Sequence, residues 1–263
     1  TIGEVGQKNY GIELTESSDI AENRMLADSF NAMSQEISSH MRTLEQANQE
    51  KQRFIDSLTH EIRTPLTSII GYSSLCLSKK EFSGAAVSQA FDNIYKNGKR
   101  IEKLTENLIK LITLDKTPVK HTIISIQKLV EDIQSNYRTR LEQDQVEFRI
   151  SGHDRKVVSD EDLLGMLFSN FIDNGIKAVS DSKEKKIEVI LEQEQVLICD
   201  SGKGLAQEDL KKIFEPFYMA DKSRKRTFEG FGLGLAICKS IMEILSIEFD
   251  IKSELGKGTT IYL

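Results

Sequence analysis

The sequence has no tryptophan, only three prolines and only three cysteines among its 263 residues. Because proline interrupts helices, its scarcity favours long helical segments. The cysteines lack the spacing of metal ligands, and an odd number of them in apolar surroundings predicts reduced core thiols in a cytosolic protein. They are Cys76, Cys199 and Cys238.

Long apolar runs are also missing from the sequence. No stretch approaches the roughly 20 apolar residues that cross a bilayer, and no segment has the pattern of a signal peptide. The net charge of −6 argues against a dedicated nucleic-acid-binding protein, which is normally basic. A hydrophobic content of 39% and a length that suits about two domains predict a soluble protein with a substantial core.

The most informative stretch is 54–72, FIDSLTHEIRTPLTSIIGY. Its apolar residues recur at helical spacing and predict an amphipathic helix. A proline inside this pattern removes a backbone hydrogen bond and predicts a bend within about a turn of His60. A single histidine in a helix is usually an ordinary surface residue. The complete string H-E-x-R-T-P-L, however, resembles the phosphoacceptor box of sensor histidine kinases, carried here by His60, Glu61, Arg63, Thr64, Pro65 and Leu66.

Helical periodicity begins well before this box. From Asp19, apolar residues step by three or four as in a coiled coil. The string ADSFNAMSQEI resembles the second helix of a HAMP signalling module, with residues 1–18 as the end of its connector; the module's first helix, which would follow a membrane span, is not in the sequence. Residues 46–53 are almost wholly polar, which predicts a solvated connecting helix or, alternatively, a weakly packed segment where the coil changes register.

The pattern also continues after the box. The segment KKEFSG at 79–84 predicts a turn, and a second helix with one apolar stripe follows from about Ala85 to Ile112. Two antiparallel helices with one stripe each cannot bury both stripes alone. A dimer that forms a four-helix bundle is therefore the simplest arrangement.

A polar linker at 115–121, DKTPVKH, separates this hairpin from a region with a different pattern of apolar residues. Short strands and helices follow, which predicts an α+β sandwich with helices layered on one face of a mixed sheet. The predicted strands are 121–126, 146–150, 186–192, 195–200, 247–253 and 259–263. The predicted helices are 125–143, 160–180, 206–213 and 232–245.

One polar cluster lies on the predicted helix 160–180. Its residues recur at steps of three and four and therefore share one face. Amide and carboxylate oxygens hold Mg²⁺, directly or through water, and a lysine meets phosphate as a point charge. A solvated helix face has the same pattern, so the cluster by itself is ambiguous. Its members are Asn170, Asp173, Asn174 and Lys177.

Three further clusters follow along the chain. In DSGKGL at 200–205, Asp200 ends a strand where it can accept a hydrogen bond from an exocyclic amine, and glycines permit close backbone approach; a plain turn is the alternative. FEPFY at 214–218 precedes a basic stretch, 219–229, that is either solvated or closes over phosphates. Glycines in GFGLGLAI run straight into an apolar helix, whose N-terminus favours phosphate. The glycines of the two glycine-rich clusters are Gly202, Gly204, Gly230, Gly232 and Gly234.

In their order and spacing, the four clusters resemble the N, G1, F and G2 boxes of the histidine-kinase ATP-binding domain, a fold shared with gyrase, mismatch-repair and chaperone ATPases. By this resemblance Asn174 holds Mg²⁺ and Asn170 lies near the phosphates and metal. Lys177 contacts phosphate, and Asp200 accepts a hydrogen bond from the adenine amine. Gly175 departs from the family, which usually has alanine there; a helical glycine costs about 1 kcal/mol relative to alanine.

The resemblance implies an ATP-dependent, homodimeric protein-histidine autokinase. His60 attacks the γ-phosphate while Glu61 accepts or shares its ring proton, and the phosphoryl group passes to an aspartate of a response regulator. Thr64 matches the position that orients water when that phosphate is removed, which implies phosphatase activity. A nucleotide-gated ATPase switch and a signalling scaffold without phosphotransfer are the alternatives.

The implied architecture is a long helical hairpin that forms a dimeric four-helix bundle, followed by an α/β-sandwich ATP-binding domain. We expect the cytoplasmic part of a membrane sensor that contacts no nucleic acid and meets the membrane only through a preceding region. The expected segments are a HAMP-like coil at 1–45, a coiled-coil connector at 46–53, a dimerisation and phosphotransfer domain at 54–115, a linker at 116–121 and a catalytic domain at 122–263.

Overall fold

The computed structural model of the protein describes residues 21–78, 84–114, 118–220 and 230–263. Four predictions lie outside the described residues: the connector at 1–18, the turn around 79–83, the first residues of the linker and the basic stretch 221–229. The chain divides into two units, Thr1–His60 and Glu61–Leu263.

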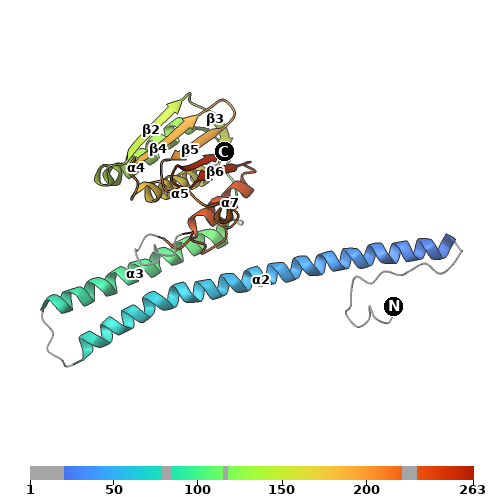
Figure 1. Ribbon diagram of the computed structural model, residues 1–263, viewed down its shortest axis with the longest axis horizontal. Coiled ribbons are helices and arrows are strands. Elements are labelled where there is room, and N and C mark those ends of the chain that lie inside the picture. Colours follow the sequence, from blue (N-terminus) through green and yellow to red (C-terminus); the bar gives the residue numbers. More distant parts are fainter. Residues whose placement is uncertain (1–20, 79–83, 115–117, 221–229) are drawn as a thin grey trace. The chain divides into compact units, whose positions relative to one another are not determined.

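Two long helices form the first part of the chain, as predicted (Figure 1). α2 spans Ala21–Leu77 and continues through Pro65, and α3 spans Gly84–Thr113. Along α3 the buried residues are Ala90, Asn97 and Leu104, whose seven-residue spacing is that of a coiled-coil seam. None of the helices in the described part of the chain combines the length and hydrophobicity of a membrane span.

Many apolar side chains of these helices are exposed to solvent in the single chain. In the unit Thr1–His60 they follow the predicted coiled-coil seam, and in the unit Glu61–Leu263 they lie on both α2 and α3. Exposed apolar surface of this extent is typical of an interaction site. The exposed residues include Met25, Met33, Met41, Leu44 and Ile55 in the first unit, and Ile62, Leu66, Ile70, Phe91, Tyr95, Ile109 and Ile112 in the second.

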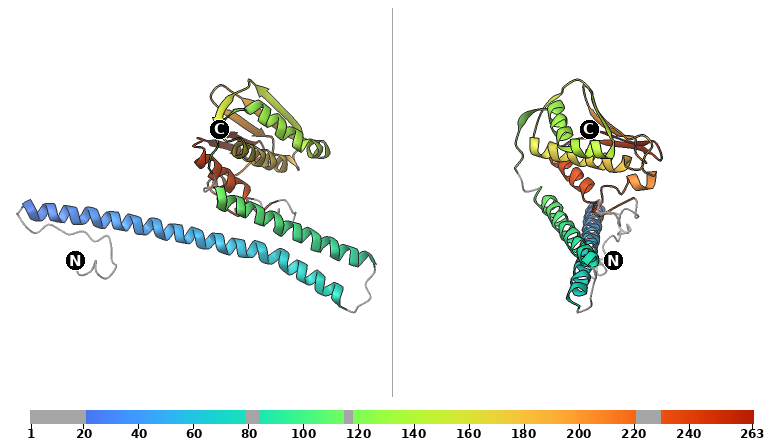
Figure 2. Two further views of the ribbon diagram at one scale, coloured as in Figure 1. Left: turned by 180° about the vertical axis from the view of Figure 1, so that it is seen from behind. Right: turned by 90° about the vertical axis from the view of Figure 1, so that its left-hand side faces the viewer.

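The remaining chain folds as a mixed sheet with helices on one face (Figures 1 and 2). The five-stranded sheet has the order β2-β4-β5-β7-β6, in which only β2 and β4 are parallel. A separate antiparallel pair joins β1 and β3. The strands are β1 Thr122–Ser125, β2 Glu147–Gly152, β3 Lys156–Ser159, β4 Lys186–Leu191, β5 Val196–Asp200, β6 Asp250–Glu254 and β7 Gly258–Tyr262.

The helices of this region are α4 Ile126–Asp144, α5 Glu161–Val179, α6 Gln207–Leu210 and α7 Gly234–Ile244. The central helix α5 packs between α4 and α7 and against the sheet. The prediction of a helix at 206–213 is wrong in length, because α6 is only a single helical turn. Strand β3 was not predicted, since its four residues have no apolar run and depend on pairing with β1.

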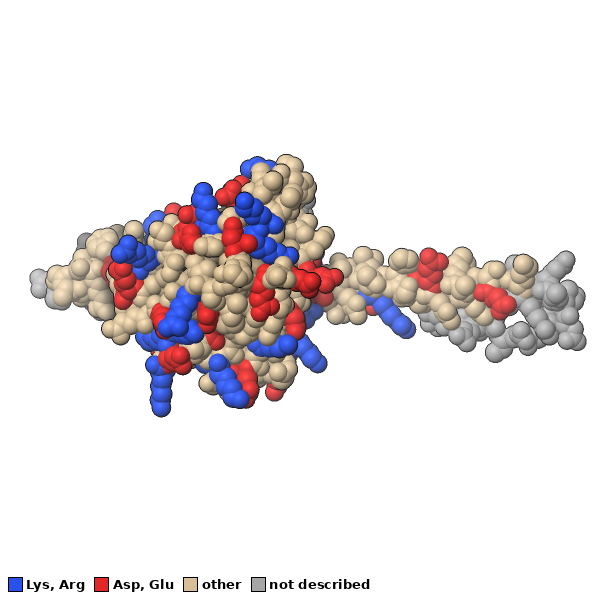
Figure 3. Space-filling view, turned by 90° about the horizontal axis from the view of Figure 1, so that it is seen from above, with Lys and Arg blue, Asp and Glu red and all other residues tan. Residues whose placement is uncertain are grey.

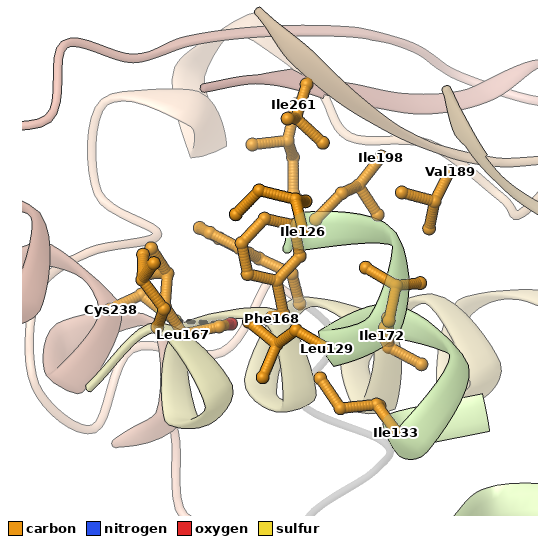
Figure 4. Packing of buried hydrophobic residues seen from close by; sticks show 14 of the residues in the cluster. Ile126, Leu129, Ile133, Leu167, Phe168, Ile172, Val189, Ile198, Cys238 and Ile261 are labelled. Atoms are coloured by element: carbon orange, nitrogen blue, oxygen red, sulfur yellow. Dashed lines mark hydrogen bonds between the residues drawn. The ribbon is translucent and has the colours of Figure 1, made fainter. Parts of the chain in front are cut away.

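The core lies between this helical layer and the sheet (Figure 4). The cluster includes side chains of α4, such as Ile133, and of α5, such as Ile172, together with Ile198 and Ile261 from the strands. The prediction that all cysteines are core thiols is wrong. Only one, Cys238 on α7, is buried, and its thiol donates to the Leu167 carbonyl at 3.9 Å; Cys76 and Cys199 are half-buried.

A buried carboxylate fixes the start of α5. Asp160 is the N-cap of this helix, and its side chain accepts from the backbone N–H of Leu163 at 3.0 Å. The same carboxylate accepts from the backbone N–H of Lys120 at 2.8 Å. One buried acid thus ties the segment before β1 to the helix that carries the polar strip.

Charges of both signs are interspersed on the face of the molecule seen in Figure 3. Lys and Arg alternate with Asp and Glu there, without a large field of one sign. On this face, a preference for a charged ligand has to come from local clusters of side chains.

Candidate functional site

The polar strip of α5 lines a cavity of about 590 Å³. Asn170, Asp173, Asn174 and Lys177 are half-buried and all border the cavity, whereas the opposite face of α5 is fully buried. This division confirms the prediction that the helix is amphipathic. The core face comprises Leu163, Leu164, Leu167, Phe168 and Ile172, as predicted, together with Phe171, Gly175, Ile176 and Val179.

Asp200 lies at the end of β5 and borders the same cavity. Burial raises the pKa of its carboxyl to about 6, and backbone hydrogen bonds from Gly202 and Thr259 oppose this rise. The Gly202 N–H donates to Oδ1 at 2.8 Å. Each carboxylate oxygen has two lone pairs, so a half-buried carboxylate that accepts these two bonds can still accept from a donor in the cavity, such as an exocyclic amine.

The glycines after Asp200 are required by close packing. A Cβ on Gly202 would lie 2.6 Å from both the Ala178 Cβ and the Asp200 Oδ1, so any side chain there would displace α5 or the carboxylate. Gly204 also borders the cavity, and its backbone lies against the turn between β6 and β7. The close backbone approach that predicted glycine at these positions is therefore made to other parts of the protein.

The second glycine run faces the polar strip of α5. A Cβ on Gly234 would lie 3.3 Å from the Asn170 Oδ1 and 4.0 Å from the Asn174 Nδ2. A Cβ on Gly230 would lie 3.9 Å from the Lys177 Nζ. The Asn170 Nδ2 donates to the Met166 carbonyl at 3.0 Å, which directs the amide oxygen away from its own helix.

Helix α7 begins at Gly234, and the residue before it, Leu233, provides no side-chain cap. The N-terminal N–H groups of α7 therefore start next to the amides of α5, in a position that favours an anion. The prediction that this helix starts at 232 is wrong by one half-turn. Gly232 has φ +69, outside the helical range, which excludes a helical start there. A Cβ on Gly232 would lie 2.6 Å from the Tyr218 carbonyl, so this position also has no room for a side chain.

A backbone contact connects the FEPFY turn to the second glycine run. The Phe217 N–H donates to the Gly232 carbonyl at 3.0 Å, and Phe217 has φ +66, an uncommon conformation for a bulky residue. The sequence gives no sign of this contact, because the two segments are not adjacent along the chain and meet only in the fold.

The residues of the predicted phosphoacceptor box lie on α2. His60 and Thr64 are both exposed. In the unit Glu61–Leu263, the Glu61 carboxylate pairs with the Arg100 guanidinium of α3 at 3.1 Å, and both side chains are largely buried. The sequence did not predict this ion pair, since its partners are 39 residues apart.

Two domain families match the chain. Residues 159–263 match the histidine kinase-, DNA gyrase B-, and HSP90-like ATPase family, and residues 50–116 match the His Kinase A (phospho-acceptor) domain. The chain belongs to the histidine kinases. A curated relative, the signal transduction histidine-protein kinase ArlS of Staphylococcus aureus strain USA300, is 32% identical over 250 residues, which are 89% of this chain and 51% of ArlS. The chain thus spans about half the length of the curated relatives it matches.

Solved structures of histidine kinases have the same fold. Acinetobacter baumannii AdeS matches 78% of this chain and 96% of its own with a TM-score of 0.58 and 21% identity. ThkA, solved in complex with the response regulator protein TrrA, matches 84% of this chain and 64% of its own with a TM-score of 0.63 and 18% identity. At these identities the likeness establishes the fold alone: helices followed by a mixed α/β domain.

In this histidine kinase, α4 contributes residues that the sequence did not single out. Tyr137 borders the cavity, and Arg140, one turn later, pairs with Asp173 of α5. Burial raises the pKa of Tyr137, and the nearby Asp173 carboxylate raises it further. No local pattern marks these positions, because they reach the site only through the packing of α4 against α5.

Proposed function

We propose that the protein is an ATP-dependent protein-histidine autokinase that phosphorylates His60 and transfers the phosphoryl group to an aspartate of a response regulator. The observation that carries the proposal is the convergence of three separate segments on one cavity. The strip of α5, Asp200 at the end of β5 and the glycines that lead into α7 all border it. Together they offer an acceptor for an amine, amides, a cation and a helix N-terminus, which are the groups that an adenine nucleotide requires.

Different residues would bind the adenine and the phosphates of the nucleotide. Asp200 would accept a hydrogen bond from the adenine amine through a remaining lone pair of its carboxylate, beside the bonds from Gly202 and Thr259. Lys177 would meet a phosphate as a point charge, and the N–H groups at the start of α7 would meet another. Gly204, Gly230, Gly232 and Gly234 border the cavity and would let the backbone approach the nucleotide closely. Gly202 does not border it and would act by leaving room for the Asp200 carboxylate.

The donor set of the strip fits Mg²⁺. This ion commonly takes one or two protein oxygens and completes its shell with water and substrate phosphates. The described residues contain no group of three or more His, Cys, Asp or Glu suited to a metal ion, so a nucleotide-borne Mg²⁺ with an amide ligand is the fitting arrangement. Asn174 would hold the ion, with Asn170 beside it. When bound, Mg²⁺ would neutralise charge on the phosphates.

The chemical step uses the exposed imidazole of His60. One neutral ring nitrogen supplies the electron pair that forms the new N–P bond, and the bond from the γ-phosphorus to the bridging oxygen of ADP breaks. Glu61, the next residue in the sequence, would accept or share the proton on the other ring nitrogen while its carboxylate stays paired with Arg100. Thr64, one turn after His60, would orient water when the regulator is dephosphorylated.

We further propose a homodimer in which the exposed apolar residues of α2 and α3 meet those of a second copy in a four-helix bundle. We propose the same segments that the sequence predicts: a HAMP-like coil at 1–45, a connector at 46–53, the phosphotransfer domain at 54–115, a linker at 116–121 and the catalytic domain at 122–263. The chain would be the cytoplasmic part of a membrane sensor.

Incubation with γ-labelled ATP and Mg²⁺ tests the activity. We expect an acid-labile, base-stable phosphoprotein from the wild type and no label in His60→Gln, which should still bind nucleotide. His40→Gln is the matched control, because His40 is another exposed histidine of α2, and this variant should label normally.

Label retained by His60→Gln would refute the assignment of the phosphoacceptor. Release of ADP without any phosphoprotein would favour a nucleotide-gated ATPase switch. A failure of the wild type to bind a fluorescent ATP analogue would favour a signalling scaffold.

A further inference from the structure

Asp173, on the polar strip of α5, pairs with cations from two helices. Its Oδ1 accepts from the Arg140 Nη1 of α4, and its Oδ2 pairs with the Lys177 Nζ one turn along α5. Arg140 also pairs with Asp144 on its own helix, with its Nε 3.5 Å from the Asp144 Oδ2. Asp173 is therefore shared between the proposed phosphate ligand, Lys177, and an arginine outside every recognised motif.

Limited solvent access strengthens this cluster. The side chains of Lys177 and Asp173 are 18% and 23% exposed, and that of Arg140 is 37% exposed. Burial disfavours the ionised form of Asp173, but Lys177 and Arg140 together hold the pKa of its carboxyl below the usual range. The carboxylate is thus ionised, and its charge acts directly on Lys177.

Lys177 is also close to the place where a phosphate would bind. Its Nζ lies 3.9 Å from the position that a Cβ on Gly230 would take, and both residues border the cavity. A lysine held by a carboxylate offers a phosphate only part of its charge. A second cation on the same carboxylate lowers the cost of releasing that lysine, because the carboxylate stays paired when the lysine turns away.

We propose that Arg140 is a positioning residue for the nucleotide phosphates: by pairing with Asp173, it lets Lys177 leave that carboxylate and engage the ligand. The proposal rests on the proposed nucleotide site. Arginine suits this role, since its planar guanidinium has several fixed donors and serves Asp173 and Asp144 at once. Arg140 itself need not touch the nucleotide.

The competing explanation is a purely structural ion pair between α4 and α5. A structural role would affect all ligands of the cavity alike, including one that has no phosphate. A role in positioning Lys177 affects only ligands with phosphates, and the effect grows with their number. Adenosine, ADP and a non-hydrolysable ATP analogue therefore separate the two explanations.

The test compares Arg140→Gln with Arg138→Gln in the full chain with Mg²⁺ present. Arg138 lies on the same helix, and its exposed side chain pairs with Glu142 at 2.9 Å, so its removal changes the net charge equally. We expect Arg140→Gln to weaken binding of the ATP analogue by about tenfold, the equivalent of one charge-assisted interaction, and to leave adenosine binding unchanged. Arg138→Gln should change neither, and Arg140→Lys should recover part of the loss.

A second substitution sharpens the test. In the Arg140→Gln background, Asp173→Asn removes the carboxylate that retains Lys177, so affinity for the ATP analogue should return to within about threefold of the wild type. Equal losses for adenosine and the analogue, wild-type affinity in Arg140→Gln, or no recovery in the double variant would each overturn the proposal. A wild type that binds no adenosine would instead overturn the nucleotide site itself.

Discussion

Replacing Asp200 by asparagine should stabilise the ATP-binding domain at pH 8 and at the same time remove its affinity for adenine nucleotides. Burial raises the pKa of this carboxyl from 3.8 to about 6. The unfolded chain releases the proton near pH 4, whereas the folded chain retains it until about pH 6. The free energy of unfolding therefore falls as the pH rises through this window.

The magnitude follows from the two pKa values. The raised pKa of Asp200 lowers the free energy of unfolding by up to about 3 kcal/mol above pH 7. The loss is about half of that at pH 5 and less than 1 kcal/mol at pH 4. Asparagine has nearly the same shape and no charge, and its oxygen can still accept from the Gly202 N–H. We expect Asp200→Asn to gain about 1–3 kcal/mol at pH 8 and about half as much at pH 5. For a domain of this size the gain raises the melting temperature by roughly 2–4 °C per kcal/mol.

The affinity of Asp200→Asn for adenine nucleotides should fall, although its stability rises. The asparagine NH₂ would face the adenine amine, so two donors would meet and the affinity should fall by more than tenfold. For the wild type, adenosine affinity should fall about tenfold between pH 8 and pH 5, because a proton on Asp200 turns one acceptor oxygen into a donor.

Urea unfolding at pH 8 and pH 5, with and without ADP, measures both effects. Asp181→Asn is the control, since this carboxylate is exposed on the same domain and should change neither quantity. If Asp200→Asn is no more stable than the wild type at pH 8, or if ADP still stabilises it fully, the assigned role of the buried carboxylate is wrong.

Two further predictions concern packing. Gly175→Ala should raise the free energy of unfolding by about 1 kcal/mol, because the new Cβ would lie at ordinary contact distance, 3.4 Å from the Ile187 Cδ1 and 3.6 Å from the Asp200 Cβ; a loss of stability in urea unfolding would mean that the core around Ile187 cannot adjust. Arg100→Ala should destabilise the hairpin by about 1–3 kcal/mol, because it leaves the largely buried Glu61 without this partner. Glu61→Gln in the Arg100→Ala background should restore part of that loss, and additive losses in thermal unfolding would contradict a coupled pair.

Short-range patterns were sufficient for most of the fold. The apolar spacing around His60 predicted the long helix α2, and the alternation at 186–192 predicted β4, because periodicity reports directly which face of an element is buried. Predictions failed where an element depends on a distant partner. Strand β3 exists through its pairing with β1. Helix α7 starts later than predicted because Gly232 has φ +69 and its carbonyl accepts from the Phe217 N–H.

The sequence by itself determined the residue types of the candidate site, since Asn170, Asn174, Lys177 and Asp200 stand in local strings that carry their own spacing. Only the tertiary structure decided how these groups are tuned. The raised pKa of Asp200 comes from burial, and the pairing of Arg140 with Asp173 comes from the packing of α4 on α5. Desolvation and ion pairing depend on neighbours in space, so no pattern along the chain contains them.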